Sequence, residues 1–162
     1  MRRAVLLWLV LLALLAGCTP AAPPATPTPN VPPAELDELQ IRTLLASEAD
    51  GVVRKDIDSL MSLWAQDGYV ADAAHTPDNP ADDLTWKGWY AVRDRYITLV
   101  FAGNAAVVEP EIVALQIAGD HAVVTATTHI NSEVSPAGDR WTFVRTPAGW
   151  RIQSLTYNLE PR

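Results

Sequence analysis

The hydrophobic residues in the middle of the chain follow a helical spacing. Between residues 35 and 55 apolar side chains recur at steps of three and four, which places them on one face of an α-helix. Residues 56–67 and 89–101 repeat this spacing, so we predict three helices. Their buried faces would carry Leu36, Leu39, Ile41, Leu44, Leu45, Ala49, Val52 and Val53, then Ile57, Leu60, Met61 and Trp64, and finally Trp89, Val92, Tyr96, Leu99 and Val100.

The pattern changes to that of β-strands after residue 106. Segments rich in Val, Ile, Thr, Trp and Tyr are separated by short stretches that contain glycine, as in β-hairpins. The predicted strands are residues 69–73, 107–118, 121–134, 139–146 and 149–159. Helices followed by hairpin-connected strands predict an α+β fold with an antiparallel sheet. One face of this sheet must pack on the helices, because no other part of the chain can cover it.

The N-terminus has the pattern of an export signal. Arg2 and Arg3 precede an apolar block at residues 4–16, and the chain's one cysteine, Cys18, follows at once. This block is shorter than the roughly 20 residues that a membrane-spanning helix needs. The run from Leu15 to Cys18 resembles the lipobox of bacterial lipoproteins, whose cysteine receives a diacylglyceryl group before the chain is cut in front of it. An uncleaved signal anchor and a soluble secretion signal are the alternatives.

We therefore expect three segments along the chain. Residues 1–17 are predicted to be the signal peptide, and residues 18–34 a lipidated cysteine with a tether that holds seven of the chain's thirteen prolines. Such a tether is extended and semi-rigid. Residues 35–162 are predicted to form one domain, which is the number expected for this length. The expected location is extracytoplasmic, with the lipid on Cys18 in a bacterial membrane.

The charge of the chain limits its partners. The formal net charge of −7 becomes −9 once Arg2 and Arg3 are removed with the signal. An acidic protein of this kind is not suited to nucleic acid or to anionic lipid headgroups. Membrane attachment is therefore expected to come from acyl chains on Cys18.

Three short motifs resemble one superfamily. They are residues 56–70 (DIDSLMSLWAQDGYV), residues 86–96 (WKGWYAVRDRY) and residues 149–152 (GWRI). In this order they resemble the nuclear transport factor 2-like superfamily, in particular its SnoaL-like members. The resemblance implies a cone-shaped domain in which three N-terminal helices pack on a curved antiparallel β-sheet. It also implies a pocket between sheet and helices, and frequent pairing through the outer face of the sheet.

The resemblance identifies only some of the catalytic residues that the superfamily uses. Asp72 falls where the steroid isomerases of the superfamily keep their general base. Their oxyanion hole needs a tyrosine and a protonated aspartic acid, but these positions fall on Glu48 and near Arg140 or Trp141. Steroid isomerisation is therefore not expected, and Asp72 and Glu48 remain as candidate catalytic residues.

Other chemistry-bearing residues have simpler interpretations. Large aromatic residues are numerous, and we expect Trp64, Tyr69, Tyr96 and Trp141 to line the pocket. His129 belongs to the polar half of an alternating strand and is expected to point away from the core. His75 with Asp72, Asp78, Asp82 and Asp83 is interpreted as part of a solvated loop, with a divalent cation site as the alternative. Neither a metal nor an organic cofactor is predicted.

Two function classes follow. The leading hypothesis is a non-catalytic module on the cell envelope that binds a small apolar ligand or an envelope protein. The alternative is an isomerase, dehydratase or cyclase with Asp72 as base and Glu48, Tyr69 or Tyr96 as polar helpers. A homodimer is a further possibility, and its contact surface would be the strand face with Thr125, Thr127 and His129.

Overall fold

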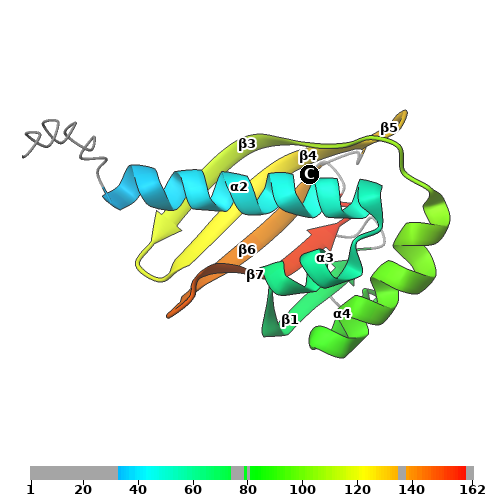
Figure 1. Cartoon of the computed structure of the whole chain (residues 1–162), viewed down its shortest axis with the longest axis horizontal. Helices are drawn as coiled ribbons and strands as arrows, with labels where there is room; N and C mark the ends of the chain where they lie inside the picture. Colours follow the sequence, from blue (N-terminus) through cyan, green and yellow to red (C-terminus); the bar gives the residue numbers. More distant parts are fainter. Residues whose placement is uncertain (1–32, 74–78, 80, 135–137, 160–162) are drawn as a thin grey trace, which may run out of the picture. The chain divides into compact units, whose positions relative to one another are not determined.

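The computed structural model describes residues 33–73, 79, 81–134 and 138–159. The helices are α2 (Pro33–Arg54), α3 (Ile57–Leu63), α4 (Trp89–Arg95), the π-helix η2 (Tyr96–Val100) and the 3-10 turn η3 (Phe101–Gly103). The strands are β1 (Trp64–Asp72), β2 (Leu84–Lys87), β3 (Val108–Ala118), β4 (His121–Ile130), β5 (Glu133–Val134), β6 (Asp139–Thr146) and β7 (Gly149–Tyr157). In Figure 1, α2 crosses the sheet in front of β3, β4, β6 and β7.

The boundary between α2 and α3 follows from local sequence. Lys55 has a positive φ of 54°, a conformation that ends a helix. The Asp56 carboxylate then accepts a 3.1 Å hydrogen bond from the backbone N–H of Ser59 and caps α3. The predicted helix at residues 35–55 therefore agrees with α2 to within two residues.

The end of the second predicted helix is wrong. It was expected to continue to residue 67, but α3 stops at Leu63 and Trp64 is extended. Trp64 is buried and pairs with Ile152 of β7, so strand pairing and burial of the indole replace further helix turns. Gly68 lies in the irregular stretch of β1, where a Cβ atom would come within 2.9 Å of the Trp64 ring. The Asp67-Gly68 pair thus shapes a strand rather than ending a helix.

The sheet is mixed rather than antiparallel. Its strands lie in the order β2-β1-β7-β6-β4-β3, and β5 pairs with β4. All described pairs are antiparallel except β1 with β7, which are parallel. The two paired strands are far apart in the chain, because β2, α4, η2, η3, β3, β4, β5 and β6 lie between β1 and β7.

The third helix differs from its prediction in position and in form. It follows β1 and β2, so the three helices are not all N-terminal to the sheet. The predicted helix at residues 89–101 is α-helical only to Arg95 and continues as the π-helix η2. Strand β2 at residues 84–87 was not predicted, and the predicted strand at 121–134 is interrupted at Asn131, which has a positive φ.

The core lies between α2, α3, α4 and one face of the sheet. Alternation in β4 buries Ala122, Val124 and Ala126, as a strand with one packed face requires. The fully or nearly buried apolar residues are Ile41, Leu45, Val52, Leu60, Met61, Trp64, Val70, Val92, Tyr96, Ala122, Val124, Ala126, Trp141, Phe143, Trp150, Ile152 and Leu155. In the part of the chain that the structure describes, no helix is both long enough and apolar enough to cross a membrane.

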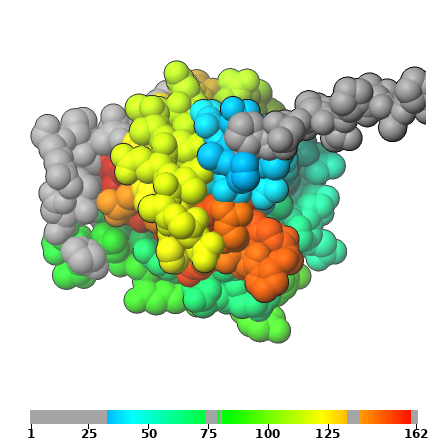
Figure 2. Space-filling model, turned by 90° about the vertical axis from the view of Figure 1, so that its left-hand side faces the viewer, coloured from blue at the N-terminus to red at the C-terminus, as the bar shows by residue number. Residues whose placement is uncertain are grey.

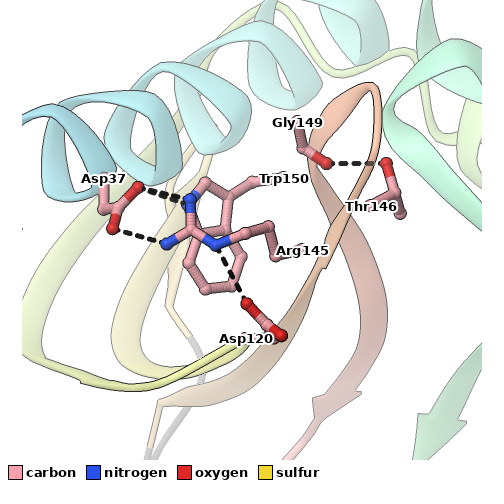
Figure 3. A network of polar contacts seen from close by, with 6 residues as sticks. All are labelled: Asp37, Asp120, Arg145, Thr146, Gly149 and Trp150. Carbon is pink, nitrogen blue, oxygen red and sulfur yellow. Dashed lines mark hydrogen bonds and ion pairs between the residues drawn. The ribbon is translucent and has the colours of Figure 1, made fainter. Parts of the chain in front are cut away.

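A polar network fastens the start of α2 to the sheet (Figure 3). The guanidinium of Arg145 donates two hydrogen bonds to the Asp37 carboxylate, one of them 2.8 Å long, and stacks 4.4 Å from the Trp150 ring centroid. Trp150 Nε1 donates to the same carboxylate at 3.0 Å, and Asp120 pairs with Arg145 at 3.2 Å. Figure 2 shows the first turns of α2, in blue, beside the yellow β3 and β4 and the orange β6 and β7. Helix α2, strands β6 and β7, and the turn between β3 and β4 therefore meet at one arginine.

Candidate functional site

A cavity of about 220 Å³ lies between the helices and the sheet. Its apolar walls are Val52, Val100, Val108, Ile130 and Leu155. Its polar and aromatic lining residues are Glu48, Arg95, Tyr96, Thr128, Asp139, Trp141, Tyr157 and Asn158. Residues from α2, η2, β4, β6 and β7 thus surround one space, and none of these elements forms it alone.

Glu48 is a buried carboxyl group on the α2 side of this cavity. It is 7% exposed, and the Tyr96 hydroxyl donates a 2.7 Å hydrogen bond to its Oε1 atom. Trp64 Nε1 in turn donates to the Tyr96 oxygen at 3.2 Å. Burial raises the pKa of Glu48 to about 7, against the opposing effects of the Tyr96 hydrogen bond and the Arg95 charge. Glu48 therefore changes its protonation state near neutral pH.

Arg95 and Tyr96 are consecutive residues that both line the cavity. They stand where α4 changes into the π-helix η2, and short π segments inside helices are frequent at functional sites. The Arg95 guanidinium lies over two rings, 5.0 Å from the Trp86 centroid and 4.8 Å from the Tyr157 centroid. Cation–π contacts with both rings hold this side chain in the wall of the cavity.

Three buried polar atoms of the cavity lining have no hydrogen-bond partner among the described residues. They are Arg95 Nε, Thr128 Oγ1 and Trp141 Nε1. Trp141 as a whole is only 3% exposed. Buried donors are nearly always paired in folded proteins, and leaving one unpaired costs about 1–3 kcal/mol. These three atoms mark the cavity as a place for a polar group from outside the chain.

Asp139 adds a second buried carboxyl group. It is 4% exposed, and its charge is one of the factors that raise the pKa of Glu48. Gly138 precedes it with a φ of +81°, packed against the backbone of Ala126. A glycine is needed there because any Cβ atom would overlap with the Ala126 carbonyl oxygen.

The predicted site residues are distributed unevenly around the cavity. Glu48, Tyr96 and Trp141 line it. Trp64 is buried and bonded to Tyr96, Tyr69 is 38% exposed, and neither lines this cavity. In β1 the side chains alternate, and this places Tyr69 on the face opposite to that of Val70.

Asp72 lies beside the cavity lining rather than in it. It is partly exposed at the end of β1, and Asn158 Nδ2 donates a 2.8 Å hydrogen bond to its Oδ1 atom. Tyr157, which does line the cavity, has its pKa raised by burial, with an additional contribution from the nearby Asp72. Asp72 is therefore bonded to Asn158 of the cavity lining but does not line the cavity itself. Glu48, which is buried in the lining, is the better candidate for the general-base role expected of Asp72.

None of the remaining candidates that the structure describes lines the cavity. Arg140, one of the two residues aligned with the missing aspartic acid, is exposed. The His129 side chain is 43% exposed and lies 4.0 Å from Glu111 of the neighbouring strand. His75, Asp78 and Cys18 lie outside the described residues, and Asp82 and Asp83 are described but do not line the cavity. Among the residues that are described, no three His, Cys, Asp or Glu side chains gather in a way that could hold a metal ion.

Sequence reasoning missed Arg95, Thr128, Asp139 and Tyr157. Arg95 stood only within the motif at residues 86–96, and Thr128 only within the strand predicted at residues 121–134. A signal for Thr128 was present, because it is a polar residue in the otherwise apolar half of the alternating strand. Arg95 carried no such signal, since its position depends on where the α-helix gives way to η2.

A second hollow, of about 500 Å³, lies between α2 and β3. It is more open, and its polar lining residues are Arg42, Asp50 and Glu109, of which Arg42 is already paired with Glu38. None of the unpartnered buried atoms found in the described residues belongs to it. The smaller and less open cavity is therefore the better candidate site.

Comparisons with known proteins agree with this architecture. A family model described as a SnoaL-like domain matches residues 41–157. An NTF2-like protein with a cystatin-like fold from Novosphingobium aromaticivorans is 24% identical, with a TM-score of 0.57 over 76% of this chain and 82% of that one. A proposed dehydratase of the NTF2-like family from Streptomyces avermitilis is 22% identical, with a TM-score of 0.53 over 78% of this chain and 97% of that one.

A third solved structure, an NTF2-like protein of unknown function from Shewanella baltica, is 13% identical, with a TM-score of 0.58 over 82% of this chain and 100% of that one. The comparison with curated proteins finds no match. Identities this low show that the fold is shared, but they do not show that an activity is shared. The predicted nuclear transport factor 2-like α+β fold is confirmed, with the mixed sheet and helix order corrected above, and the chain belongs to the SnoaL-like domain family.

Proposed function

We propose that the domain binds a small, largely apolar molecule with a hydrogen-bond-accepting oxygen inside this cavity. The observation that carries the proposal is that Arg95 Nε, Thr128 Oγ1 and Trp141 Nε1 are buried without partners, and all three residues line one apolar space. A ligand oxygen would satisfy donors that the fold leaves unpaired. Ligand sites commonly combine apolar walls with a few converging polar groups in this way.

The size of the cavity limits the ligand. A volume of about 220 Å³ lies below the range of about 300–1,000 Å³ typical of pockets for drug-sized molecules. Cyclohexanone is a suitable probe, because it combines a compact apolar body with one acceptor oxygen. Methylcyclohexane has nearly the same shape and no acceptor.

The test is NMR titration of the full chain with these two probes. We expect cyclohexanone to shift the indole N–H signal of Trp141 and to bind more tightly than methylcyclohexane. Thr128→Val removes a lining hydroxyl without changing side-chain shape, and should weaken the binding of cyclohexanone. Thr125→Val is the matched control, since Thr125 lies on the same strand and does not line the cavity. Equal binding of both probes, or no shift at Trp141, would contradict the proposal.

A second candidate function, acid–base catalysis, is favoured by the Glu48–Tyr96 pair. A carboxyl group with a pKa of about 7 inside an apolar cavity is suited to accept or donate a proton at neutral pH. Tyr96 holds this group by a 2.7 Å hydrogen bond. In this alternative Glu48 takes the general-base role expected of Asp72, and the substrate is a small carbonyl compound.

Deuterium exchange distinguishes catalysis from binding. If Glu48 is a general base, the protein should accelerate exchange of the α-hydrogens of cyclohexanone in D₂O, and the rate should rise with pH through about 7. Glu48→Gln should abolish the acceleration, whereas Glu38→Gln on the exposed face of α2 should not. Binding of cyclohexanone without accelerated exchange would leave the non-catalytic function as the correct one.

We further propose that the domain is carried on the outer side of a bacterial membrane by a lipid on Cys18. The support is the order of charge, apolar block, small residues and cysteine at residues 2–18. Mass spectrometry of the membrane-extracted protein should find a diacylglyceryl group on Cys18 as the first residue of the mature chain. Cys18→Ser should abolish this processing and release the protein from the membrane fraction. An unprocessed wild-type chain in the membrane would contradict the proposal.

A further inference from the structure

The guanidinium group of Arg95 is the cationic feature of the cavity. It lies over the rings of Trp86 and Tyr157, at 5.0 and 4.8 Å from their centroids. A planar guanidinium held against aromatic rings makes its hydrogen bonds through its edges. A stacked arginine therefore presents its N–H groups in one plane, in the geometry that suits a planar anion.

No carboxylate in the described residues lies within 4.0 Å of a guanidinium nitrogen of Arg95. Three of the other arginines, Arg42, Arg54 and Arg145, do have such partners. Arg95 Nε also lacks a hydrogen-bond partner although the atom is buried. Arg95 is therefore a partly buried cation that packs on aromatic rings and has no ion-pair partner among the described residues.

The neighbouring unpartnered atoms complement this cation. Trp141 Nε1 can only donate a hydrogen bond, and Thr128 Oγ1 can donate or accept one. A carboxylate has two acceptor oxygens with several lone pairs, so one such group can accept hydrogen bonds from more than one donor. A ketone oxygen offers fewer lone pairs and no charge.

Two carboxyl groups face the same space and define the charge balance. Glu48 is uncharged below a pH of about 7 and then does not oppose an anion. Asp139 is buried in the same lining and its charge acts against an anion, whereas Arg95 is a cation of the lining. An anionic group is therefore favoured only in direct contact with the guanidinium, and the rest of the ligand is apolar.

We propose that the natural ligand is a small monocarboxylate, whose carboxylate pairs with the edge of the Arg95 guanidinium while its apolar body lies against the aliphatic walls of the cavity. This inference rests on the proposed function and adds the chemical class of the ligand. The donors of Trp141 and Thr128 complete the recognition of the carboxylate oxygens, and Trp86 and Tyr157 hold the guanidinium in position.

The test compares cyclohexanecarboxylate with cyclohexyl methyl ketone, which has a similar shape and no charge, at about pH 6 on the full chain. A hydrogen bond to a charged group is worth more than one to a neutral group, so we expect the carboxylate to bind about tenfold more tightly. Its binding should also shift the Arg95 Nε–H and Trp141 indole N–H signals. Because these readouts use the wild-type protein, they do not depend on any variant folding.

Variants of Arg95 then test whether this residue causes the preference for the carboxylate. Arg95→Gln should remove the preference for the carboxylate over the ketone, and Arg95→Lys should restore part of it, since lysine keeps the charge and loses the planar fork. Arg93→Gln, two residues earlier on α4 and outside the cavity lining, should leave the preference unchanged.

The outcomes separate the two proposals. If both compounds shift Trp141 but bind equally well, the monocarboxylate proposal is overturned and small-molecule binding stands. The same conclusion follows if the carboxylate binds more tightly but retains its preference in a folded Arg95→Gln protein. If neither compound perturbs any residue of the cavity, the proposed binding function is overturned together with this inference.

Discussion

The Tyr96 hydroxyl donates a 2.7 Å hydrogen bond to Glu48 Oε1, and both side chains are buried. Tyr96 comes from the π-helix η2 and Glu48 from the middle of α2, so the bond joins two elements that are 48 residues apart in the chain. Burial raises the pKa of the carboxyl group, and the hydroxyl moderates that rise because it stabilises the ionised form. This pair governs how the cavity responds to pH.

Stability should depend on the charge of Glu48. Its pKa is about 7 in the folded protein and 4.5 in an unfolded chain, so the stabilisation is complete below pH 4.5 and is lost as the pH rises through about 7. Relative to Glu48→Gln, the wild type should lose about 3 kcal/mol of unfolding free energy between pH 4.5 and about 8. Urea unfolding of both proteins over this range measures the difference, and parallel pH profiles would refute the prediction.

Removing the Tyr96 hydroxyl should raise the pKa of Glu48 further. Tyr96→Phe deletes the hydrogen bond that favours the carboxylate and leaves Trp64 Nε1 without its partner. The unpaired indole should also destabilise the fold by about 1–3 kcal/mol. Carbon-13 NMR titration of the Glu48 carboxyl group checks the pKa. Tyr90→Phe, at a side chain that is 82% exposed, is the control and should change neither quantity.

The Asp37–Arg145 pair should contribute to stability more than an ordinary surface ion pair. Arg145 and Trp150 hold the pKa of Asp37 below its usual value of 3.8, so this contribution is present above pH 3.8 and is lost as the pH falls below it. A double-mutant cycle of Asp37→Asn with Arg145→Gln should give a larger coupling than Glu38→Gln with Arg42→Gln on the same helix. Equal coupling in the two cycles would show that the network does not fasten α2.

Gly138→Ala should disturb the side of the cavity that carries Asp139. The φ of +81° and the overlap of a Cβ atom with the Ala126 oxygen both oppose a side chain there. Strain of this kind costs about 1–3 kcal/mol before any clash is counted. Thermal unfolding and cyclohexanone binding should both be impaired, whereas Gly103→Ala, with nothing within 4 Å of the new Cβ atom, should leave both intact.

Local pattern was enough to find most elements of the fold. The helical spacing from Leu36 to Val53 predicted α2, and the alternation that buries Val124 and exposes Val123 predicted β4 and its inward face. These features depend on residues close together in the chain, because each element must present one apolar face to a core. The α+β class follows from the order of such elements.

Contacts between distant residues decided the rest. Trp64 continues a helical pattern, yet pairing with Ile152 makes it the first residue of a strand, and the parallel pairing of β1 with β7 has no local signature. The sequence singled out Glu48, Tyr96 and Trp141 as candidates, but only the packing of α2, η2 and β6 around one cavity brings them together with Arg95 and Asp139. Burial raises the pKa of Glu48 and leaves Trp141 Nε1 unpartnered, and burial is a property of the assembled fold and not of any single segment.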